Sequence, residues 1–294
     1  MGDYLVRAVG ADGDFRIFAC TATDLVDQAR KRHSTWPVAT AALGRTMIAS
    51  LLLGANMKGE DIITLRVLGD GPLGAVVVTA DAKGKVRGYV QNPNIHLPSP
   101  KPGKLAVGAA VGKGLLNITR DLGLKEPFTG SVELVSGEIA EDLALYLTKS
   151  EQTPSAVSLG VLVEPDNSVR AAGGLILQLM PGADDEVLEK LEENLASLPP
   201  ISSLVAEGKK PEDIVELVCQ NLSFKIVGDM PICFSCNCSR ERLKNILISL
   251  GSEELEEMIS EQGQAEVQCH FCSEKYTFNS SELQQILRQA IENN

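Results

Sequence analysis

Five of the seven cysteines in this 294-residue chain are grouped in a pattern that suits metal binding or thiol redox chemistry. They are Cys233, Cys236 and Cys238, followed after a gap of thirty residues by Cys269 and Cys272. Two short cysteine pairs separated by a longer segment have the spacing of a closed zinc site. Four thiolates satisfy the tetrahedral preference of Zn²⁺ and leave no open position for water or a substrate. The pattern therefore predicts one structural, non-hydrolytic zinc ion per chain.

The spacing by itself leaves two sets of zinc ligands open. The first set is Cys236, Cys238, Cys269 and Cys272, and the second replaces Cys238 by Cys233 to give an ordinary CxxC/CxxC arrangement. The Cys236-x-Cys238 pair is tighter than the common CxxC knuckle and points towards thiol redox chemistry. The spacing alone does not decide between redox regulation and a purely structural site.

Three further residues, one beside the cysteine group and two outside it, are not expected to bind metal. His270 lies between two of the cysteines and is expected to face solvent. Cys20 and Cys219 lie outside the group and are expected to pack in the core as small apolar side chains.

Composition limits the class of protein. Hydrophobic residues make up 44% of the chain, which is enough for a sizeable core. The amino terminus has no basic-then-apolar signal pattern and no apolar run is long enough to span a membrane, so a cytosolic protein without a membrane partner is expected. In that reducing compartment, clustered cysteines indicate metal or redox function rather than a disulfide framework.

The net charge of −12 lies in the carboxy-terminal part of the chain. Residues 181–230 hold 11 acidic and 4 basic side chains, and residues 239–294 hold 10 and 5. An acidic zinc module repels phosphate backbones, so nucleic-acid binding is not expected.

The first 180 residues predict an α+β domain of antiparallel strands packed around a buried apolar helix. The segment 38–57 is apolar nearly all round, as expected of a helix that is covered on more than one side, and Thr23 is expected to cap the helix before it. No Gly-rich phosphate loop, GxSxG elbow or HExxH pair occurs, so an enzyme is not expected. The other expected elements are a hairpin over 4–20, strands over 62–68, 73–80, 86–91, 115–120 and 130–134, a helix over 139–149 and a hairpin over 157–179.

Residues 181–230 are predicted to form a helical linker. Amphipathic helices around 184–195 and 211–218 are separated by Pro199-Pro200. Such short helices are not stable in isolation, so the linker is expected to need a neighbouring surface on which to fold.

Residues 231–294 are predicted to form a small zinc-bound domain. Helix caps are expected at Ser239, Ser252 and Asn279, and residues 267–278 are expected to form a hairpin with the second cysteine pair in its turn. A unit of this size with few large apolar residues has too little core to be stable without a metal.

The cysteine pattern and the residues that follow its first half resemble the redox switch of the heat-shock protein 33 family. The matching segments are Cys236-Asn-Cys238-Ser-Arg-Glu-Arg242 and, after the gap, Cys269-His-Phe-Cys272. Members of that family are bacterial, cytosolic, redox-regulated holdase chaperones. The resemblance extends over the whole chain, since an α+β domain, a helical linker and a zinc domain follow one another in the same order. Cys233 is not part of the family pattern.

The resemblance implies roles for individual residues. Cys236, Cys238, Cys269 and Cys272 would be the zinc ligands, and on oxidation they would form the disulfides Cys236–Cys238 and Cys269–Cys272. It also implies that the reduced, zinc-bound protein is inactive, and that disulfide formation releases zinc and unfolds the carboxy-terminal domain. The activated form, a homodimer, would hold unfolding client proteins without ATP and prevent their aggregation under oxidative and heat stress.

Two other functions are alternatives to the chaperone. One is a constitutive zinc-stabilised binding protein in which oxidation has no role, and the other is a thiol-disulfide oxidoreductase. An oxidoreductase of the thioredoxin type needs its CxxC pair at the start of a helix, whereas Cys269 and Cys272 are expected in a hairpin turn.

Overall fold

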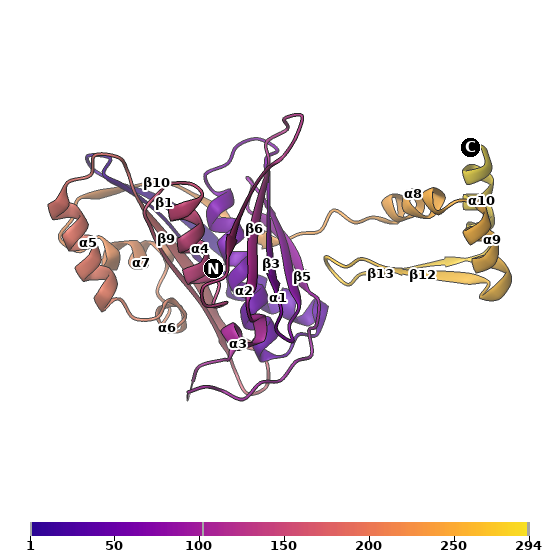
Figure 1. Cartoon of the computed structure of the whole chain (residues 1–294), viewed down its shortest axis with the longest axis horizontal. Helices are drawn as coiled ribbons and strands as arrows, with labels where there is room; N and C mark the ends of the chain where they lie inside the picture. The colour runs from indigo at the N-terminus through magenta and orange to yellow at the C-terminus, as the bar shows by residue number, and fades with distance from the viewer. Residues whose placement is uncertain (1, 102, 293–294) are drawn as a thin grey trace. The chain divides into compact units, whose positions relative to one another are not determined.

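The computed structural model describes residues 2–101 and 103–292, and these form two compact units (Figure 1). The first unit extends to Ser235 and the second begins at Cys236. The first unit is built from two β-sheets with helices, and the second from one hairpin and three helices. The α+β class predicted from the sequence is confirmed.

Helix α2 (Pro37–Gly54) lies between the two sheets of the first unit and contacts strands of both (Figure 1). It begins with proline at its first position, where the missing N–H costs nothing. Its length and hydropathy would suit a membrane span, but 89% of it is buried inside the protein. Its one charged side chain, Arg45, donates a 2.6 Å hydrogen bond to the Glu138 carboxylate. The prediction of a buried apolar helix is confirmed.

The first sheet has five antiparallel strands in the order β10-β1-β2-β9-β8. The strands are β1 (Tyr4–Gly10), β2 (Phe15–Thr21), β8 (Ser155–Val163), β9 (Val169–Leu179) and β10 (Phe224–Pro231). The first four match the hairpins expected from the alternation of the sequence. One face of this sheet packs against α2.

The second sheet has the order β11-β5-β4-β3-β6-β7, and only β11 runs parallel to its neighbour. Helix α1 (Thr23–His33) contacts β5 and β11, and helix α4 (Ala140–Lys149) contacts β6 and β7. The short helix α3 (Val107–Val111) contacts α2 and β3. The strands are β3 (Ile62–Gly69), β4 (Ala75–Asp81), β5 (Lys85–Val90), β6 (Gly114–Asp121), β7 (Phe128–Glu133) and β11 (Cys233–Phe234).

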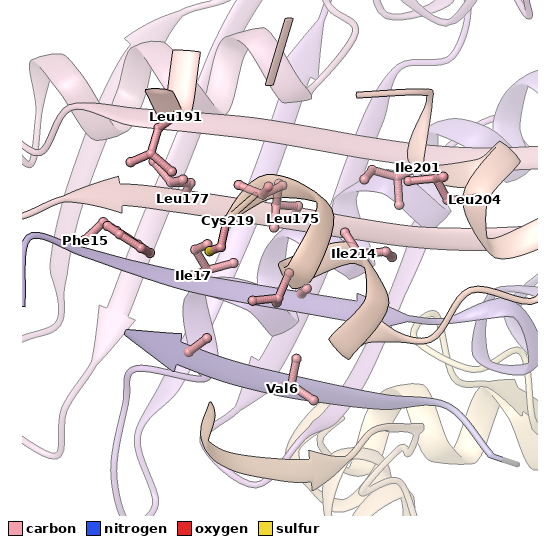
Figure 2. Packing of buried hydrophobic residues seen from close by; sticks show 14 residues of the cluster. Val6, Phe15, Ile17, Leu175, Leu177, Leu191, Ile201, Leu204, Ile214 and Cys219 are labelled. Atoms are coloured by element: carbon pink, nitrogen blue, oxygen red, sulfur yellow. The ribbon is translucent and has the colours of Figure 1, made fainter. Parts of the chain in front are cut away.

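Three linker helices cover the other face of the first sheet: α5 (Asp185–Ser197), α6 (Ile201–Ala206) and α7 (Pro211–Val218). Figure 2 shows their apolar side chains lying on those of β1, β2 and β9. The sheet side of this cluster is formed by Val6, Ala8, Phe15, Ile17, Ala19, Leu175 and Leu177, and the helix side by Leu191, Ile201, Leu204, Ile214, Val215, Val218 and Cys219. The linker helices thus lie on a surface of the first unit, as their amphipathic pattern requires.

The second unit contains α8 (Arg240–Leu250), α9 (Ser252–Glu261), the hairpin β12 (Gln264–Gln268) and β13 (Lys275–Asn279), and α10 (Ser280–Glu292). A small core joins the helices to the hairpin. Its buried members are Leu243, Leu247, Leu255, Ala265, Phe278, Leu283, Ile286 and Ala290. The expected hairpin and the expected helices of this region are confirmed.

Several details differ from the sequence predictions. Thr23 does not cap α1, because its hydroxyl accepts a bond from the Ala172 amide. The carboxylate of Asp3, from outside the helix, accepts the Thr23 and Leu25 amides at 3.0 and 2.7 Å instead. Ser252 is the first residue of α9 rather than its cap, which is Gly251. Helix α3 was not predicted.

The linker region is not wholly helical, since residues 224–231 form strand β10. Its alternation is interrupted by Gly228, Asp229 and Pro231, and its partner β1 lies more than 200 residues away in sequence. The predicted boundaries at 180/181 and 230/231 stay predictions, while the compact units meet at 235/236.

We predict that Gly174→Ala destabilises the first unit by about 1–3 kcal/mol, because an added methyl group overpacks the contact between β9 and α2. A Cβ atom at position 174 would lie 2.4 Å from Cγ2 of Ile48 and 2.9 Å from Cδ2 of Leu159. Urea unfolding followed by circular dichroism measures the change. Gly2→Ala is the control, since a Cβ there meets nothing within 4 Å. Equal midpoints for both variants would contradict this close packing.

Candidate metal centre

The connection between β12 and β13 presents Cys269 and Cys272. The Cys269 amide donates to the Glu274 carbonyl at 2.9 Å, which closes the end of the hairpin. The Ser273 amide donates back to the Cys269 carbonyl at 2.8 Å, and Ser273 has a positive φ of 58°. The Sγ atoms of the two cysteines in this turn lie within 4.8 Å of each other. The pair lies in a hairpin turn and not at a helix start, which was the expected difference from a thioredoxin-type site.

The other two thiols, of Cys236 and Cys238, lie in the extended segment before α8. The hydroxyl of Ser239 accepts the Arg242 amide at 3.2 Å and caps that helix, as predicted. The guanidinium of Arg242 donates back to the Asn237 carbonyl at 3.1 Å, between the two cysteines. The cap and this bond together fix the segment at the start of α8.

Arg240 ties the segment to the hairpin and to α10. Its Nη2 atom donates to the Thr277 carbonyl and to the Glu282 carboxylate, both at 2.7 Å. Its guanidinium carbon lies 4.4 Å from the centre of the Phe278 ring, a cation–π contact. From the sequence, Arg240 and Arg242 were expected only as part of the family pattern, with no individual role. The available signal was two arginines, separated by one residue, within four residues after the CxC pair.

These elements bring four sulfur atoms together. The Sγ atoms of Cys236, Cys238, Cys269 and Cys272 all lie within 4.8 Å of one another. Cys236 and Cys269 are 3.8 Å apart, and Cys238 and Cys272 are 3.3 Å apart. Four sulfurs around one tetrahedral zinc ion are separated by about 3.8 Å. The donor set and its dimensions therefore fit a tetrahedral metal ion of the zinc class.

Electrostatics supports the same conclusion. Burial raises the pKa of the Cys269 thiol, and the neighbouring Cys236 raises it further. Burial also raises the pKa of Cys272. Four thiolates at these distances repel one another, so all four ionise together only around a cation. The chemistry open to the site is thus metal binding by thiolates or formation of disulfides.

Tyr276 adds a polar contact that was not predicted from the sequence. Its hydroxyl lies 3.4 Å from Sγ of Cys238. This hydrogen bond raises the pKa of Tyr276 to about 12. The hydroxyl therefore stays protonated at neutral pH and can donate to a thiolate at Cys238. Tyr276 and Phe278 are two residues apart in β13 and therefore lie on the same face of the hairpin. The pairing of β13 with β12, in which Tyr276 lies opposite Val267, fixes the position of the Tyr276 side chain.

The remaining cysteines lie elsewhere. Cys233 is exposed in β11, outside the sulfur group, and its amide donates to the Gly84 carbonyl at 3.0 Å. Cys20 and Cys219 are buried in the first unit, as predicted, and burial raises the pKa of each to about 12. His270 is exposed and does not belong to the group. Of the two ligand sets left open by the spacing, the sulfur group in the second unit corresponds to the first.

Comparison with known proteins identifies relatives over the full length. The Hsp33 protein family model matches residues 3–279. The 33 kDa chaperonin of Desulforamulus reducens is 66% identical over 292 residues, 99% of each chain. That of Bacillus subtilis is 52% identical over 283 residues, which cover 96% of this chain and 97% of the other. A crystal structure of the 33 kDa chaperonin (heat shock protein 33 homolog) from Thermotoga maritima matches with a TM-score of 0.92 at 38% identity, covering 99% of this chain and 100% of that one.

We predict that Arg240→Ala lowers the thermal midpoint of the second unit, because the cation–π contact with buried Phe278 alone contributes roughly 1 kcal/mol. Near-ultraviolet circular dichroism of the tyrosine in this unit would follow the transition. Arg288→Ala is the matched control, since Arg288 is exposed on α10. An equal effect of the two substitutions would show that Arg240 does not hold the cysteine segment.

Proposed function

The chain belongs to the Hsp33 (heat-shock protein 33) family of non-enzymatic chaperones, and we propose that it is a redox-regulated, ATP-independent holdase. In this proposal it binds unfolding proteins under oxidative and heat stress in the cytoplasm and prevents their aggregation. The observation that carries the proposal is the group of four cysteine sulfurs within 4.8 Å of one another in the small second unit. These four sulfurs can either hold a metal ion or form two disulfides, but they cannot do both at once.

We propose that Cys236, Cys238, Cys269 and Cys272 hold one Zn²⁺ ion in the reduced state. Zinc, when bound, supplies the positive charge that keeps the four sulfurs as thiolates. The Tyr276 hydroxyl, 3.4 Å from Sγ of Cys238, can donate to a thiolate there, and Arg240 and Arg242 fix the backbone around the first pair. A thiolate is also the form of cysteine that peroxide and hypochlorous acid attack.

We propose that oxidation closes the disulfides Cys236–Cys238 and Cys269–Cys272. For each pair, one thiolate attacks a peroxide oxygen, the O–O bond breaks, and a sulfenic acid and hydroxide form. The second thiolate of the pair attacks the sulfenic sulfur and displaces a second hydroxide. Two electrons pass from each cysteine pair to each peroxide. A disulfide sulfur is a poor metal ligand, so the pairs that are covalently closed no longer hold the ion.

Loss of the ion is expected to unfold the second unit. Structural zinc contributes on the order of 10–16 kcal/mol of apparent binding free energy in small domains, which is as large as the ~5–15 kcal/mol net stability of a typical domain. Among the described residues of this unit, the apolar core has eight buried members. We propose that the unit remains folded only while the ion is bound.

We propose that the client surface includes the apolar face beneath the linker helices. Helices α5, α6 and α7 are short, and in α5 only Leu191 is buried. Helices of this length depend on the surface below them for stability. Their release would uncover the sheet residues Val6, Phe15, Ile17, Leu175 and Leu177 (Figure 2). Contiguous apolar surface of this kind is what unfolding proteins bind.

The proposal also covers the oligomeric state and the partners of the chain. The homodimer of the oxidised form is proposed from the family resemblance. The net charge of −12 disfavours a nucleic-acid partner, and no membrane partner is proposed. Of the alternatives, a thiol-disulfide oxidoreductase is disfavoured because Cys269 and Cys272 lie in a hairpin turn. A constitutive zinc-stabilised binding protein is separated from the proposal by the experiment that follows.

We predict that oxidation couples metal release to chaperone activity. Reduced protein is titrated with hydrogen peroxide or hypochlorous acid while a chromogenic chelator measures zinc and light scattering measures aggregation of a heat-unfolded test protein. About one zinc per chain is expected to leave as four thiols disappear, because one tetrahedral ion has four sulfur ligands. Aggregation is expected to be suppressed only after that release. Cys233→Ser, outside the group, should behave like the unaltered chain.

Zinc release without any suppression of aggregation would contradict the switch and support a purely structural site. Suppression by the reduced, zinc-bound protein that does not change on oxidation would support the constitutive binding protein instead.

We also predict that Ile214→Ala activates the protein at lower oxidant concentration. Ile214 is fully buried against the first sheet, and its truncation should cost about 2–5 kcal/mol of packing free energy. The linker helices should then release more readily without a change at the cysteines. Aggregation assays across an oxidant series, with zinc release measured in parallel, test this. Leu124→Ala, at a side chain that is 70% exposed, is the control. Identical activation curves for both variants would exclude the surface beneath α7 from the client site.

A further inference from the structure

We propose that an extended segment of a non-native client binds the activated protein as an antiparallel strand on the edge of β1, in the place that β10 occupies. This inference rests on the proposed holdase function and adds a second mode of contact to it. The apolar face beneath the linker helices would bind client side chains. The edge of β1 would bind the client backbone.

Strand β10 is held in its place mainly by backbone pairing, together with the partly buried Phe224, which packs against the apolar cluster beneath the linker helices. It pairs with seven residues of β1, from Tyr4 opposite Pro231 to Gly10 opposite Phe224. None of its side chains is fully buried, and Ile226 and Val227 are 44% and 51% exposed. Because apolar burial is the main source of stability, a strand with no fully buried side chain should need less free energy to remove than β1, β2 or β9.

Strand β1 is anchored in the opposite way. Leu5, Val6 and Ala8 are at most 1% exposed, and β1 also pairs with β2 along six residues. Removal of β10 therefore leaves β1 in the sheet, with one edge unpaired. An unpaired edge with free N–H and C=O groups is a template for another extended chain, and β-strand addition is a common mode of peptide recognition.

The backbone groups that would become free can be assigned from the bonds at the two ends of the pairing. The Ile232 amide donates to the Asp3 carbonyl, and the Ala11 amide donates to the Ser223 carbonyl. In an antiparallel strand, alternate residues direct both backbone groups to the same neighbour. The odd-numbered residues of β1, Leu5, Arg7 and Val9, therefore face β10. The even-numbered residues Val6 and Ala8 face β2.

The same alternation holds on β10, with one irregularity. Met230, Gly228 and Lys225 stand opposite the three odd-numbered residues and direct their backbone groups to β1. The register shifts between Arg7 and Ala8, where Val227 is the extra residue of a bulge. Ile226 and Asp229 direct their backbone groups away from β1. An incoming strand needs to satisfy three residues of β1, not a particular sequence.

Arg7 favours one kind of residue in the incoming strand at the position opposite it. A Cβ atom at Gly228, opposite Arg7, would lie 2.9 Å from Nη2 of the arginine. Nε of Arg7 is buried and has no hydrogen-bond partner among the described residues. A client strand therefore fits best with a small residue opposite Arg7, and a polar atom next to it could accept from Nε. The partner is thus an extended polypeptide segment with a small residue opposite Arg7.

The segments connected to the two ends of β10 determine how it could leave β1. At one end β10 follows the linker helices. At the other end a single residue, Ile232, connects it to β11, and Ser235 then connects β11 to Cys236. Strand β11 has only two residues. When the linker helices are released, β10 loses the ordered neighbours at its start. Ile232 and Phe234, which are 5% and 7% exposed, still anchor the segment after it, so β10 would leave β1 as a loop between that anchor and the released helices.

Hydrogen exchange read residue by residue tests the inference in the full chain. In the reduced protein, the amides of Leu5, Arg7 and Val9 should be protected. Peroxide activation should remove that protection by at least about tenfold, while the amides of Val6 and Ala8 keep theirs, because they bond to β2. Addition of a heat-unfolded test protein should restore protection to the odd-numbered amides alone. Aggregation of the same test protein is followed in parallel.

A pair of synthetic peptides provides a matched control. Both carry the sequence 222–232, one N-methylated at Lys225 and Met230 and the other at Ile226 and Asp229. N-methylation removes a donor only where the amide faces β1, so the second peptide should bind the activated protein and restore protection. The first should bind at least about tenfold more weakly, since two backbone hydrogen bonds are lost.

Each other outcome overturns the inference. Odd-numbered amides that stay protected on activation would show that β10 does not leave. Protection that is lost but not restored by client, while aggregation is still suppressed, would place client binding elsewhere and leave the proposed function intact. Protection restored without client by raising the protein concentration would identify a second copy of the chain as the occupant. Absence of any suppression of aggregation would instead contradict the proposed function itself.

Discussion

Mutual repulsion among four cysteine sulfurs is the constraint on which the second unit depends. Cys236, Cys238, Cys269 and Cys272 lie within 4.8 Å of one another, so they cannot all ionise without a cation among them. Protonation of the thiols, a bound metal ion or a pair of disulfides each relieves this repulsion, and the last two use the same sulfurs. A metal ion bound here and disulfides formed here would therefore exclude one another.

The chain shows a graded series of attachments to the first unit. Helix α2 is buried between two sheets, and the linker helices bury a few residues each on one face. Strand β10 has no fully buried side chain and is held mainly by its backbone pairing, with Phe224 partly buried against the linker cluster. Free energies of local opening follow buried apolar area, so β10 and the linker helices should open more readily than α2. Beyond β10 the chain is anchored again, because Ile232 and Phe234 are buried.

Particular residues explain where the sequence predictions were right. Ser239 was predicted to cap α8 and does so, because capping is decided within one helical turn. The turn with Cys269 and Cys272 was predicted from local alternation, and the apolar segment around Leu51 from composition. Thr23 and β10 show the opposite case. The hydroxyl of Thr23 bonds to Ala172, and β10 pairs with β1, and both partners are distant in sequence.

The sequence by itself determined the cysteine pattern, the α+β class, the buried helix and the family, since these depend on residue type, spacing and local periodicity. Only the tertiary structure decided which sulfurs meet, where the linker helices lie, and that Arg240 and Tyr276 complete the candidate metal centre. Those features are contacts between segments far apart in the chain. Their register is fixed by packing and strand pairing, for which a local pattern carries no information.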